Sequence, residues 1–271
     1  MHNYEQEYYE SRHFWEGESL QDEWNTKRFL ETTALIPKSV SSLADIGCGN
    51  GLFLNFVHRE RPSIELIGID RSKAALELVK FKKAQGDIAA IPLPDHSYDC
   101  VTCLEVIEHL PIKIFENALS ELSRVAKDYI IISVPFAEVL EENYTKCPRC
   151  KTSFNADLHL RNFSDADMET LLVKHGFSLV TSKKTGERVR FKGHYQFRKI
   201  FHRKQFSEWR SPICPVCGYK AETVGQEKQS AVPETTVSQN GFVSYFTAIP
   251  KLFWPKERKY YWIICLYEKS K

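Results

Sequence analysis

The fold is decided by residues 45–51, which read Asp45-Ile46-Gly47-Cys48-Gly49-Asn50-Gly51. An apolar run precedes this stretch and an amphipathic pattern follows it, which predicts a strand, a glycine-rich turn and a helix. Glycines at such a turn let a ligand approach the backbone at the start of the helix. The spacing is G-x-G-x-G, and Leu52 stands where a dinucleotide-binding turn needs its third glycine. The turn therefore predicts a bound nucleoside but disfavours a nicotinamide cofactor.

Around this turn, short apolar runs alternate with helical patterns from residue 43 to about residue 183. This alternation predicts an α/β fold with a doubly wound, mostly parallel sheet. The expected strands are Leu43–Ile46, Ile64–Ile69, Cys100–Leu104, Tyr129–Val134, Phe177–Ser182 and Tyr260–Tyr267. The expected helices are Leu52–Arg59, Lys73–Lys82, Ile112–Val125 and one that begins after the N-cap Ser164 and stops at Gly176.

The charge of the chain is nearly balanced, with 37 basic and 35 acidic residues among 271. Its net charge therefore gives no indication that it binds nucleic acids or membranes. Locally, residues 1–31 are acidic and residues 183–210 are basic, with aromatic side chains between the charges. The longest apolar run, Tyr260–Tyr267, is too short for a membrane span. We expect a cytoplasmic protein whose basic stretch is either a solvated helix face or a nucleic-acid contact.

A second acid supports the cofactor interpretation, because Asp70 closes the second predicted strand and can accept both ribose hydroxyl protons. With Gly86-Asp87-Ile88, Leu93-Pro94 and Tyr98-Asp99, these motifs resemble class I S-adenosylmethionine-dependent methyltransferases over about Leu43 to Val134. The resemblance implies a Rossmann-like sheet with an antiparallel last strand and S-adenosylmethionine as cofactor. It implies cofactor contacts by Asp45, Gly47, Gly49, Gly51, Asp70, Asp87, Ile88 and Glu105. The alternative is a glycine turn that binds no ligand.

The catalytic candidates lie in Glu105-Val106-Ile107-Glu108-His109, after the strand Cys100–Leu104. Ligands of open α/β sheets bind at the carboxyl ends of the strands, where this segment lies. Methyl transfer from a sulfonium is a direct displacement, so the enzyme aligns the acceptor and removes at most one proton. Glu105 and His109 are spaced by one helical turn and can both face the cleft. As a general base, His109 would give an activity that rises with pH near 6.5.

The same E-x-x-E-H string resembles two metal-using groups, the O-methyltransferases of ubiquinone biosynthesis and the small-RNA 2′-O-methyltransferases. Both add a histidine beyond the next strand, a position that His159 can fill here. The resemblance implies a second divalent site for Mg²⁺ or another ion, made of Glu105, Glu108, His109 and His159. Such a site would bind paired acceptor oxygens and lower their pKa. The alternative is a metal-free enzyme in which His109 is a base or a structural group.

Two Cys-Pro-x-Cys pairs predict a structural zinc site made of Cys147, Cys150, Cys214 and Cys217. The family fold that the chain resembles brings both insertions to one edge of the sheet, where zinc can staple them into a cap. The alternatives are two unrelated turns or a redox pair. The other four cysteines, Cys48, Cys100, Cys103 and Cys265, suit reduced thiols.

These features predict four segments: an N-terminal acidic and aromatic lid segment at 1–40, a core at 41–184 with a Cys-pair insertion at 136–156, a basic cap insertion at 185–257, and a final core strand at 258–271. The start at His13-Phe14-Trp15, the Cys-pair insertion and the W-x-x-x-x-Y-x-K ending resemble bacterial methyltransferases of surface-glycan biosynthesis. The leading hypothesis is O-methylation of a small or carbohydrate-type acceptor. The alternatives are a nucleic-acid (RNA) methyltransferase, whose basic stretch would line the cleft, and a catalytically silent module without an acceptor pocket.

Overall fold

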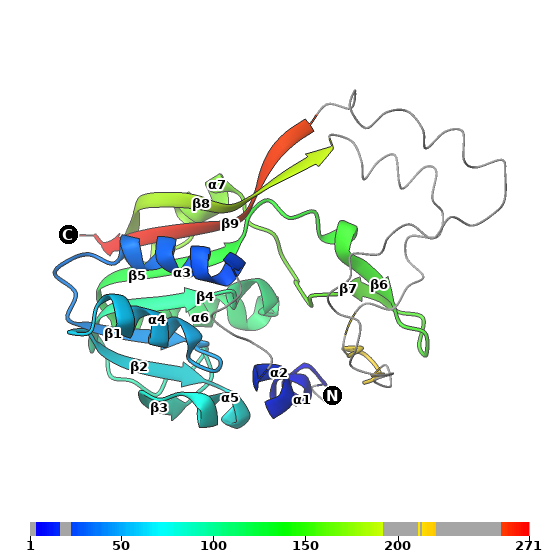
Figure 1. Ribbon diagram of the computed structural model, residues 1–271, viewed down its shortest axis with the longest axis horizontal. Coiled ribbons are helices and arrows are strands. Elements are labelled where there is room, and N and C mark those ends of the chain that lie inside the picture. Colours follow the sequence, from blue (N-terminus) through cyan, green and yellow to red (C-terminus); the bar gives the residue numbers. More distant parts are fainter. Residues whose placement is uncertain (1–3, 17–22, 192–210, 212, 221–255, 271) are drawn as a thin grey trace.

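A seven-stranded sheet forms the centre of the computed structural model, which describes residues 4–16, 23–191, 211, 213–220 and 256–270 (Figure 1). Its strands are β1 (Ser42–Ile46), β2 (Glu65–Asp70), β3 (Lys82–Gln85), β4 (Tyr98–Leu104), β5 (Ala126–Pro135), β8 (Phe177–Phe191) and β9 (Lys256–Lys269). The order is β3-β2-β1-β4-β5-β9-β8. Strands β1 to β5 pair in parallel, and β9 runs antiparallel to both of its neighbours. The predicted α/β sheet with an antiparallel last strand is confirmed.

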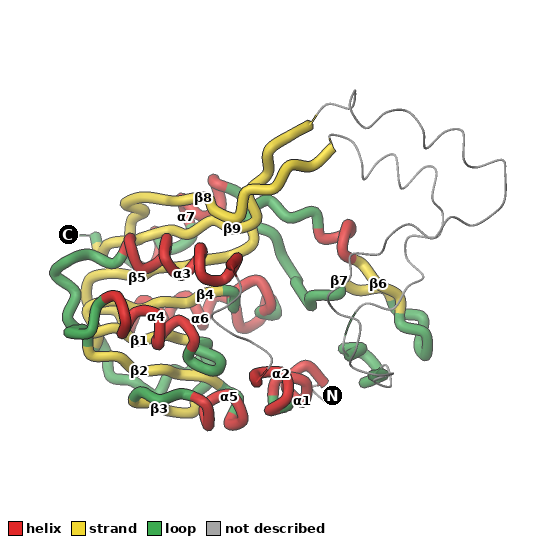
Figure 2. The backbone as a smooth tube through the Cα atoms, in the orientation of Figure 1, coloured by secondary structure: helices red, strands yellow, loops and turns green. Residues whose placement is uncertain are grey.

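Helices cover both faces of this sheet (Figure 2). One face carries α3 (Glu23–Leu35), α4 (Leu52–Glu60) and α5 (Lys73–Leu78), and the other carries α6 (Ile112–Val125) and α7 (Asp165–Thr170). In α6 the buried side chains recur every three or four residues, which places one apolar stripe on the sheet. The apolar members of this stripe are Phe115, Ala118, Leu119, Leu122 and Val125. Each large side chain of this kind stabilises the fold by about 1.5–3 kcal/mol.

The turn between β1 and α4 has the backbone geometry that only glycine adopts without strain. Gly47, Gly49 and Gly51 have φ angles of 76°, 53° and 77°. The amides of Gly47 and Cys48 donate to the carbonyl of Ile69 at 2.7 and 3.1 Å, so the turn is tied to the end of β2. The glycine-rich turn is thereby held at the carboxyl edge of the sheet, where the parallel strands end.

One predicted helix is wrong in its length, because α5 ends at Leu78 rather than at Lys82. The backbone turns extended at Val79, and the Lys83 ammonium donates to the carbonyls of Leu76 and Val79. Lys82 instead begins β3, which the sequence analysis missed. This strand lies at the edge of the sheet and its side chains are largely exposed, so it lacks an apolar run.

The predicted helix after Ser164 begins as expected and is broken before its end. Ser164 caps α7, and its hydroxyl accepts from the Asp167 amide while the Asp167 carboxylate accepts from the Ser164 amide. A separate 3₁₀ turn, Val173–His175, then leads to Gly176, whose φ of 82° ends the helical segment. The capping signal was therefore correct at both ends.

Beyond the core, β8 and β9 continue as a two-stranded arm (Figure 1). β8 passes the expected boundary at residue 184 and reaches Phe191, opposite Lys256. A 3₁₀ turn (Leu140–Asn143) and a small hairpin of β6 (Tyr144–Lys146) and β7 (Ser153–Asn155) follow β5. Most of the expected cap and of the basic stretch, at 192–210, 212 and 221–255, lies outside the described residues. Among the helices that the structure describes, none is long and apolar enough to cross a membrane.

Candidate active site

A pocket opens at the carboxyl ends of β1, β2 and β4, where the sequence analysis expects the cofactor. Its lining includes five predicted cofactor residues, namely Gly47, Asp70, Asp87, Ile88 and Glu105. The predicted catalytic residue His109 also lines it, together with Ile46, Arg71, Gly86, Val106, Leu110, Pro111 and Ile114. Asp45, Gly49 and Gly51 are not among the lining residues. A catalytically silent module would lack a pocket beside Glu105 and His109, and the structure has a pocket there.

Asp70 fixes the glycine turn and faces the pocket at the same time. Its carboxylate accepts from the amides of Gly49 and Ser72, both at 2.8 Å, and only 8% of the residue is exposed. Burial raises the pKa of Asp70, while the two amide hydrogen bonds act against that rise. The remaining lone pairs of this carboxylate are those that the predicted ribose contact requires.

Asp45 lies beneath the turn rather than in the pocket. The hydroxyl of Thr102 donates to its carboxylate at 2.6 Å, and 3% of the residue is exposed. Burial raises the pKa of Asp45 to about 7. The side chain therefore links β1 to β4 directly below the cofactor pocket.

The N-terminal helices α1 (Tyr4–Tyr9) and α2 (Arg12–Glu16) bring two aromatic side chains to the pocket, Tyr9 and Trp15. The carbonyl of Tyr9 accepts from the Ser72 hydroxyl at 2.7 Å, and the carbonyl of Trp15 accepts from the Asn50 amide group at 2.8 Å. The Trp15 ring lies so close to Gly49 that a Cβ there would come within 2.6 Å of it. Helix α2 thus contacts the glycine turn itself, and α1 contacts Ser72 just after β2. The α3 part of the segment 1–40 packs on the sheet instead.

Glu105 is held by three partners on three different elements. Its carboxylate accepts from the Trp262 indole at 2.6 Å and from the Ser133 hydroxyl at 3.0 Å, and it pairs with Arg28 at 3.4 Å. The φ of Glu105 is 57°, and only Ile107–His109 form a 3₁₀ turn, so Glu105 and His109 do not share a helix, although both line the pocket as expected. Sequence reasoning missed Arg28, because one arginine inside an amphipathic helix carries no motif.

Three of the four residues predicted for a divalent site converge. Ligand atoms of Glu108, His109 and His159 all lie within 4.8 Å of one another, and the two imidazole rings are 4.9 Å apart. Glu105 is not in this group, since its carboxylate is bound by Arg28, Trp262 and Ser133. The chain segment that carries His159 reaches the site because the Leu160 amide donates to the carbonyl of Glu108.

Glu108 is a buried carboxyl next to the pocket residue His109, whose Nε2 lies 3.9 Å from Oε1 of Glu108. Only 1% of it is exposed, and among the described residues neither carboxylate oxygen has a hydrogen-bond partner. Burial, followed by repulsion from Glu105, raises its pKa well above the usual range. A buried carboxyl without a partner is costly, and a bound cation would remove that cost. The donor set of one carboxylate and two imidazoles fits a divalent ion.

His109 is neutral at physiological pH in this environment. Burial, together with the neighbouring His159, lowers its pKa to about 3. A base with this pKa is fully deprotonated near pH 6.5, so the expected rise of activity in that range moves to lower pH. Neutral imidazole is also the form that binds metal ions.

Two acids that the sequence analysis did not select lie on the other side of His159 in a group of their own. Glu138, Asp157 and His159 form a second group whose ligand atoms lie within 4.8 Å of one another. The Glu138 carboxylate is 2.6 Å from Nδ1 of His159. Both acids lie in irregular chain between β5 and α7 and belong to no motif, so their sequence context gives no signal.

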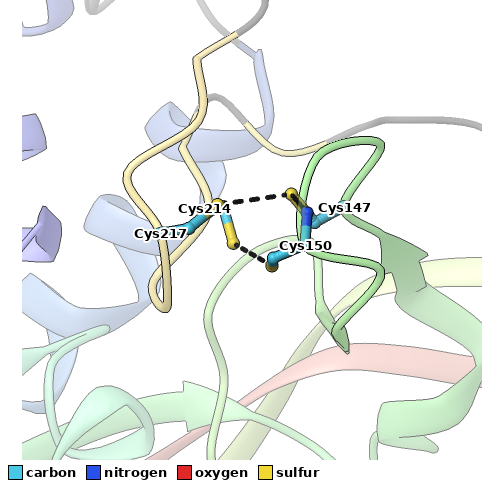
Figure 3. Close-up of side chains that lie close together, drawn as sticks. All are labelled: Cys147, Cys150, Cys214 and Cys217. Atoms are coloured by element: carbon cyan, nitrogen blue, oxygen red, sulfur yellow. Dashed lines mark hydrogen bonds between the residues drawn. The ribbon is translucent and has the colours of Figure 1, made fainter.

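The four cysteines of the two pairs come together, although 63 residues separate Cys150 from Cys214. Figure 3 shows the two loops facing each other, with Sγ–Sγ distances of 3.6 Å for Cys147–Cys217 and 3.7 Å for Cys150–Cys214. A tetrahedron of thiolates about 2.3 Å from zinc has edges of about 3.8 Å. None of the eight cysteines, all in the described part of the chain, forms a disulfide. The cluster therefore fits a zinc ion.

The two cysteine loops share one backbone design. In each, the amide after the second cysteine donates to the carbonyl of the first, from Lys151 to Cys147 and from Gly218 to Cys214. Lys151 and Gly218 have φ angles of 64° and 67°. Two loops of equal geometry that present their thiols to each other are typical of paired zinc knuckles.

Comparison with known proteins agrees with this fold. Residues 44–132 match the methyltransferase domain family. A ubiquinone biosynthesis O-methyltransferase from Alkalilimnicola ehrlichii is 37% identical over 79 residues, which are 26% of this chain and 31% of that protein. The tRNA (carboxymethyluridine(34)-5-O)-methyltransferase of Mus musculus is 32% identical over 104 residues, 37% of this chain and 15% of that protein. These alignments thus span a third or less of each curated relative.

The likeness in structure extends further along the chain than the likeness in sequence. The crystal structure of a candidate methyltransferase from Bacillus halodurans has a TM-score of 0.52 and 15% sequence identity to this chain. The alignment covers 90% of this chain and 98% of that one. At this level of identity the comparison shows the shared fold.

Proposed function

Because the chain belongs to the class I S-adenosylmethionine-dependent methyltransferases, we propose that it methylates a hydroxyl oxygen of a small or carbohydrate-type acceptor. One observation carries the proposal. The pocket that contains Asp70 and Asp87 also contains His109, and His109 belongs to the cluster with Glu108 and His159. Cofactor and acceptor groups therefore share one opening.

The cofactor residues have separate roles in this proposal. Asp70 accepts the ribose hydroxyls, and Asp87 with Ile88 borders the adenine. Gly47 keeps a side chain away from the ligand, Gly49 and Gly51 give the turn the positive φ angles that it needs, and Asp45 supports the turn from below. Helices α1 and α2 act as a lid through Tyr9 and Trp15. S-adenosylmethionine supplies the electrophilic methyl group when it is bound.

Glu108, His109 and His159 are the proposed ligands of a divalent ion, and their two imidazoles and one carboxylate suit a transition metal ion better than Mg²⁺. The ion would act as a Lewis acid that lowers the pKa of the acceptor hydroxyl. Glu105 lies beside this cluster and is kept in place by Arg28 and Trp262, which leaves it as a wall of the pocket rather than a ligand. The neutral His109 can instead take the acceptor proton if no ion is bound. An acceptor with two neighbouring oxygens suits the cluster best, since an ion can bind both.

An RNA acceptor is the second candidate, supported by the partial similarity to the tRNA methyltransferase of Mus musculus. The described part of the basic stretch does not favour an RNA acceptor. Lys183 pairs with Glu31 and Lys184 pairs with Asp165, and neither of these two side chains lines the pocket. We therefore rank small hydroxylated acceptors first.

The proposal is tested by transfer of a labelled methyl group from S-adenosylmethionine to three sets of acceptors: vicinal diols and catechols, matched compounds with a single hydroxyl, and RNA. We expect turnover with the first set and weak or no turnover with the second. Label that enters RNA alone would replace the small-acceptor proposal, and label on an amine would contradict O-methylation. The Asp70→Ala variant serves as the blank for cofactor-independent label.

We also propose that the four-cysteine cluster holds one structural zinc ion that joins the two insertions. Purified protein should contain one equivalent of zinc by elemental analysis, and Cys214→Ser should lower that content because three thiolates bind less tightly than four. Cys100→Ala is the matched control, since Cys100 is buried in β4 away from the cluster. Zinc-free wild-type protein, or full zinc content in Cys214→Ser, would refute this assignment.

A further inference from the structure

We propose that Glu138 is a positioning residue that orients the imidazole of His159 for the divalent site. The inference rests on the proposed function, because it concerns the ion that Glu108, His109 and His159 would bind. It assigns a role to a residue that no motif marks. Glu138 does not touch the acceptor in this proposal, and it acts only through His159.

The contact between the two side chains is short and shielded from solvent. Oε2 of Glu138 lies 2.6 Å from Nδ1 of His159, and the exposed fractions of the side chains are 19% and 7%. In the neutral imidazole one nitrogen carries a proton and the other has a free lone pair. A carboxylate at Nδ1 keeps the proton on that nitrogen. Nε2 is then the nitrogen that remains to bind a metal ion.

The backbone directs both side chains toward this contact at a cost in strain. Ala137, directly before Glu138, has a φ of 47°, and Leu158, directly before His159, has a φ of 62°. Such angles are uncommon for residues other than glycine and concentrate at functional sites. The two turns are fixed by hydrogen bonds, from the Ala137 amide to Phe163 and from the Leu158 amide to Asn155. The surrounding structure therefore determines where the two side chains meet.

Metal-binding histidines commonly donate a hydrogen bond from their second ring N–H to a carboxylate. This bond fixes the orientation of the ring and strengthens the ligand. Glu138 stands in this relation to His159. The competing assignment is that Glu138 is itself a ligand, since Glu138, Asp157 and His159 also lie within reach of one ion. Direct ligation would take the carboxylate away from the Nδ1 proton. The two assignments predict different results for a glutamine, whose amide oxygen still accepts from Nδ1–H.

The test is Mn²⁺ binding measured by electron paramagnetic resonance on the full-length, zinc-loaded protein. Mn²⁺ suits carboxylate and imidazole ligands better than thiolates. We expect Glu138→Ala to weaken Mn²⁺ binding by about 10- to 100-fold. Glu138→Gln should stay within about threefold of the wild type, because the hydrogen bond is kept. Glu141→Ala is the matched control on an exposed acid of the adjoining 3₁₀ turn, and it should bind as the wild type does.

A second readout follows the imidazole itself without metal. Nitrogen-15 NMR of histidine-labelled protein should show His159 with its proton on Nδ1 in the wild type and in Glu138→Gln, and a changed tautomer population in Glu138→Ala. Wild-type Mn²⁺ affinity in Glu138→Ala would overturn the inference. Equal losses in the alanine and glutamine variants would make Glu138 a ligand and also overturn it. Wild-type protein that binds S-adenosylmethionine but no Mn²⁺ would remove the metal proposal together with this inference.

Discussion

Asp70→Ala is expected to lower the affinity for S-adenosylmethionine by at least about 100-fold. Two ribose hydroxyls lose a charged acceptor, and hydrogen bonds to charged groups contribute about 1.5–3 kcal/mol each. The variant also frees the amides of Gly49 and Ser72, which now donate to Asp70. Calorimetric titration with S-adenosylhomocysteine measures the loss. Asp128→Ala, an exposed acid on β5, is the control and should bind normally.

Gly49→Leu should lower the affinity for S-adenosylmethionine by at least as much, for a different physical reason. A side chain at Gly49 meets the Trp15 ring, and the φ of 53° is strained for leucine. Trp15→Ala combined with Gly49→Leu removes that clash but leaves the strained backbone of the turn. If both Asp70→Ala and Gly49→Leu bound the cofactor product with wild-type affinity, the assignment of the site would be wrong.

Glu108→Ala is expected to reduce turnover by at least about 100-fold and yet to leave the metal-free protein as stable as the wild type or more stable. A Lewis acid contributes several kcal/mol to such a reaction, which explains the loss of rate. The stability follows because a buried carboxyl without a hydrogen-bond partner is removed. His109→Ala should lose turnover to a similar degree. Initial rates and thermal unfolding, measured on the same samples, test both statements.

The two roles considered for His109 are separated by chelation. With a catalytic ion, a chelator should abolish turnover, and Glu108→Ala should be as damaging as His109→Ala. With His109 as a metal-free base, turnover should survive chelation and stay flat across pH 6.5, since burial lowers the pKa of His109 to about 3. Zinc must be assayed in parallel because the chelator can empty the cysteine cluster. His58→Ala, on the exposed side of α4, is the control. A wild-type rate in His109→Ala would refute both roles.

The central part of the fold could be predicted from sequence because its signals are local. Glycines 47, 49 and 51 need positive φ angles, and the apolar runs of β1, β2, β4 and β5 are buried between two helical layers. Ser164 and Gly176 marked the ends of one helical segment for the same reason. Edge strand β3 escaped detection, since exposed side chains leave no periodic pattern in Lys82–Gln85.

The site was predictable only where chemistry is concentrated in a motif. E-x-x-E-H and the cysteine pairs name their residues, and the resemblance to two metal-using methyltransferase groups pointed to His159 beyond the next strand. Glu138 and Arg28 reach the site through tertiary contacts between segments distant in sequence. A lone acid in a loop and a lone base in a helix look like ordinary surface residues. Even the backbone at Glu105, which is not helical, is set by its hydrogen bond to Ser133 on β5.

The most direct test of the central claim is calorimetric titration of the unmodified, full-length chain with S-adenosylhomocysteine and, separately, with NAD⁺. Our account predicts saturable binding of one S-adenosylhomocysteine per chain and no binding of NAD⁺, because Asp70 is placed for a ribose while Leu52 occupies the position of the third glycine. Binding of NAD⁺ in place of S-adenosylhomocysteine, or binding of neither ligand by folded protein, would contradict it.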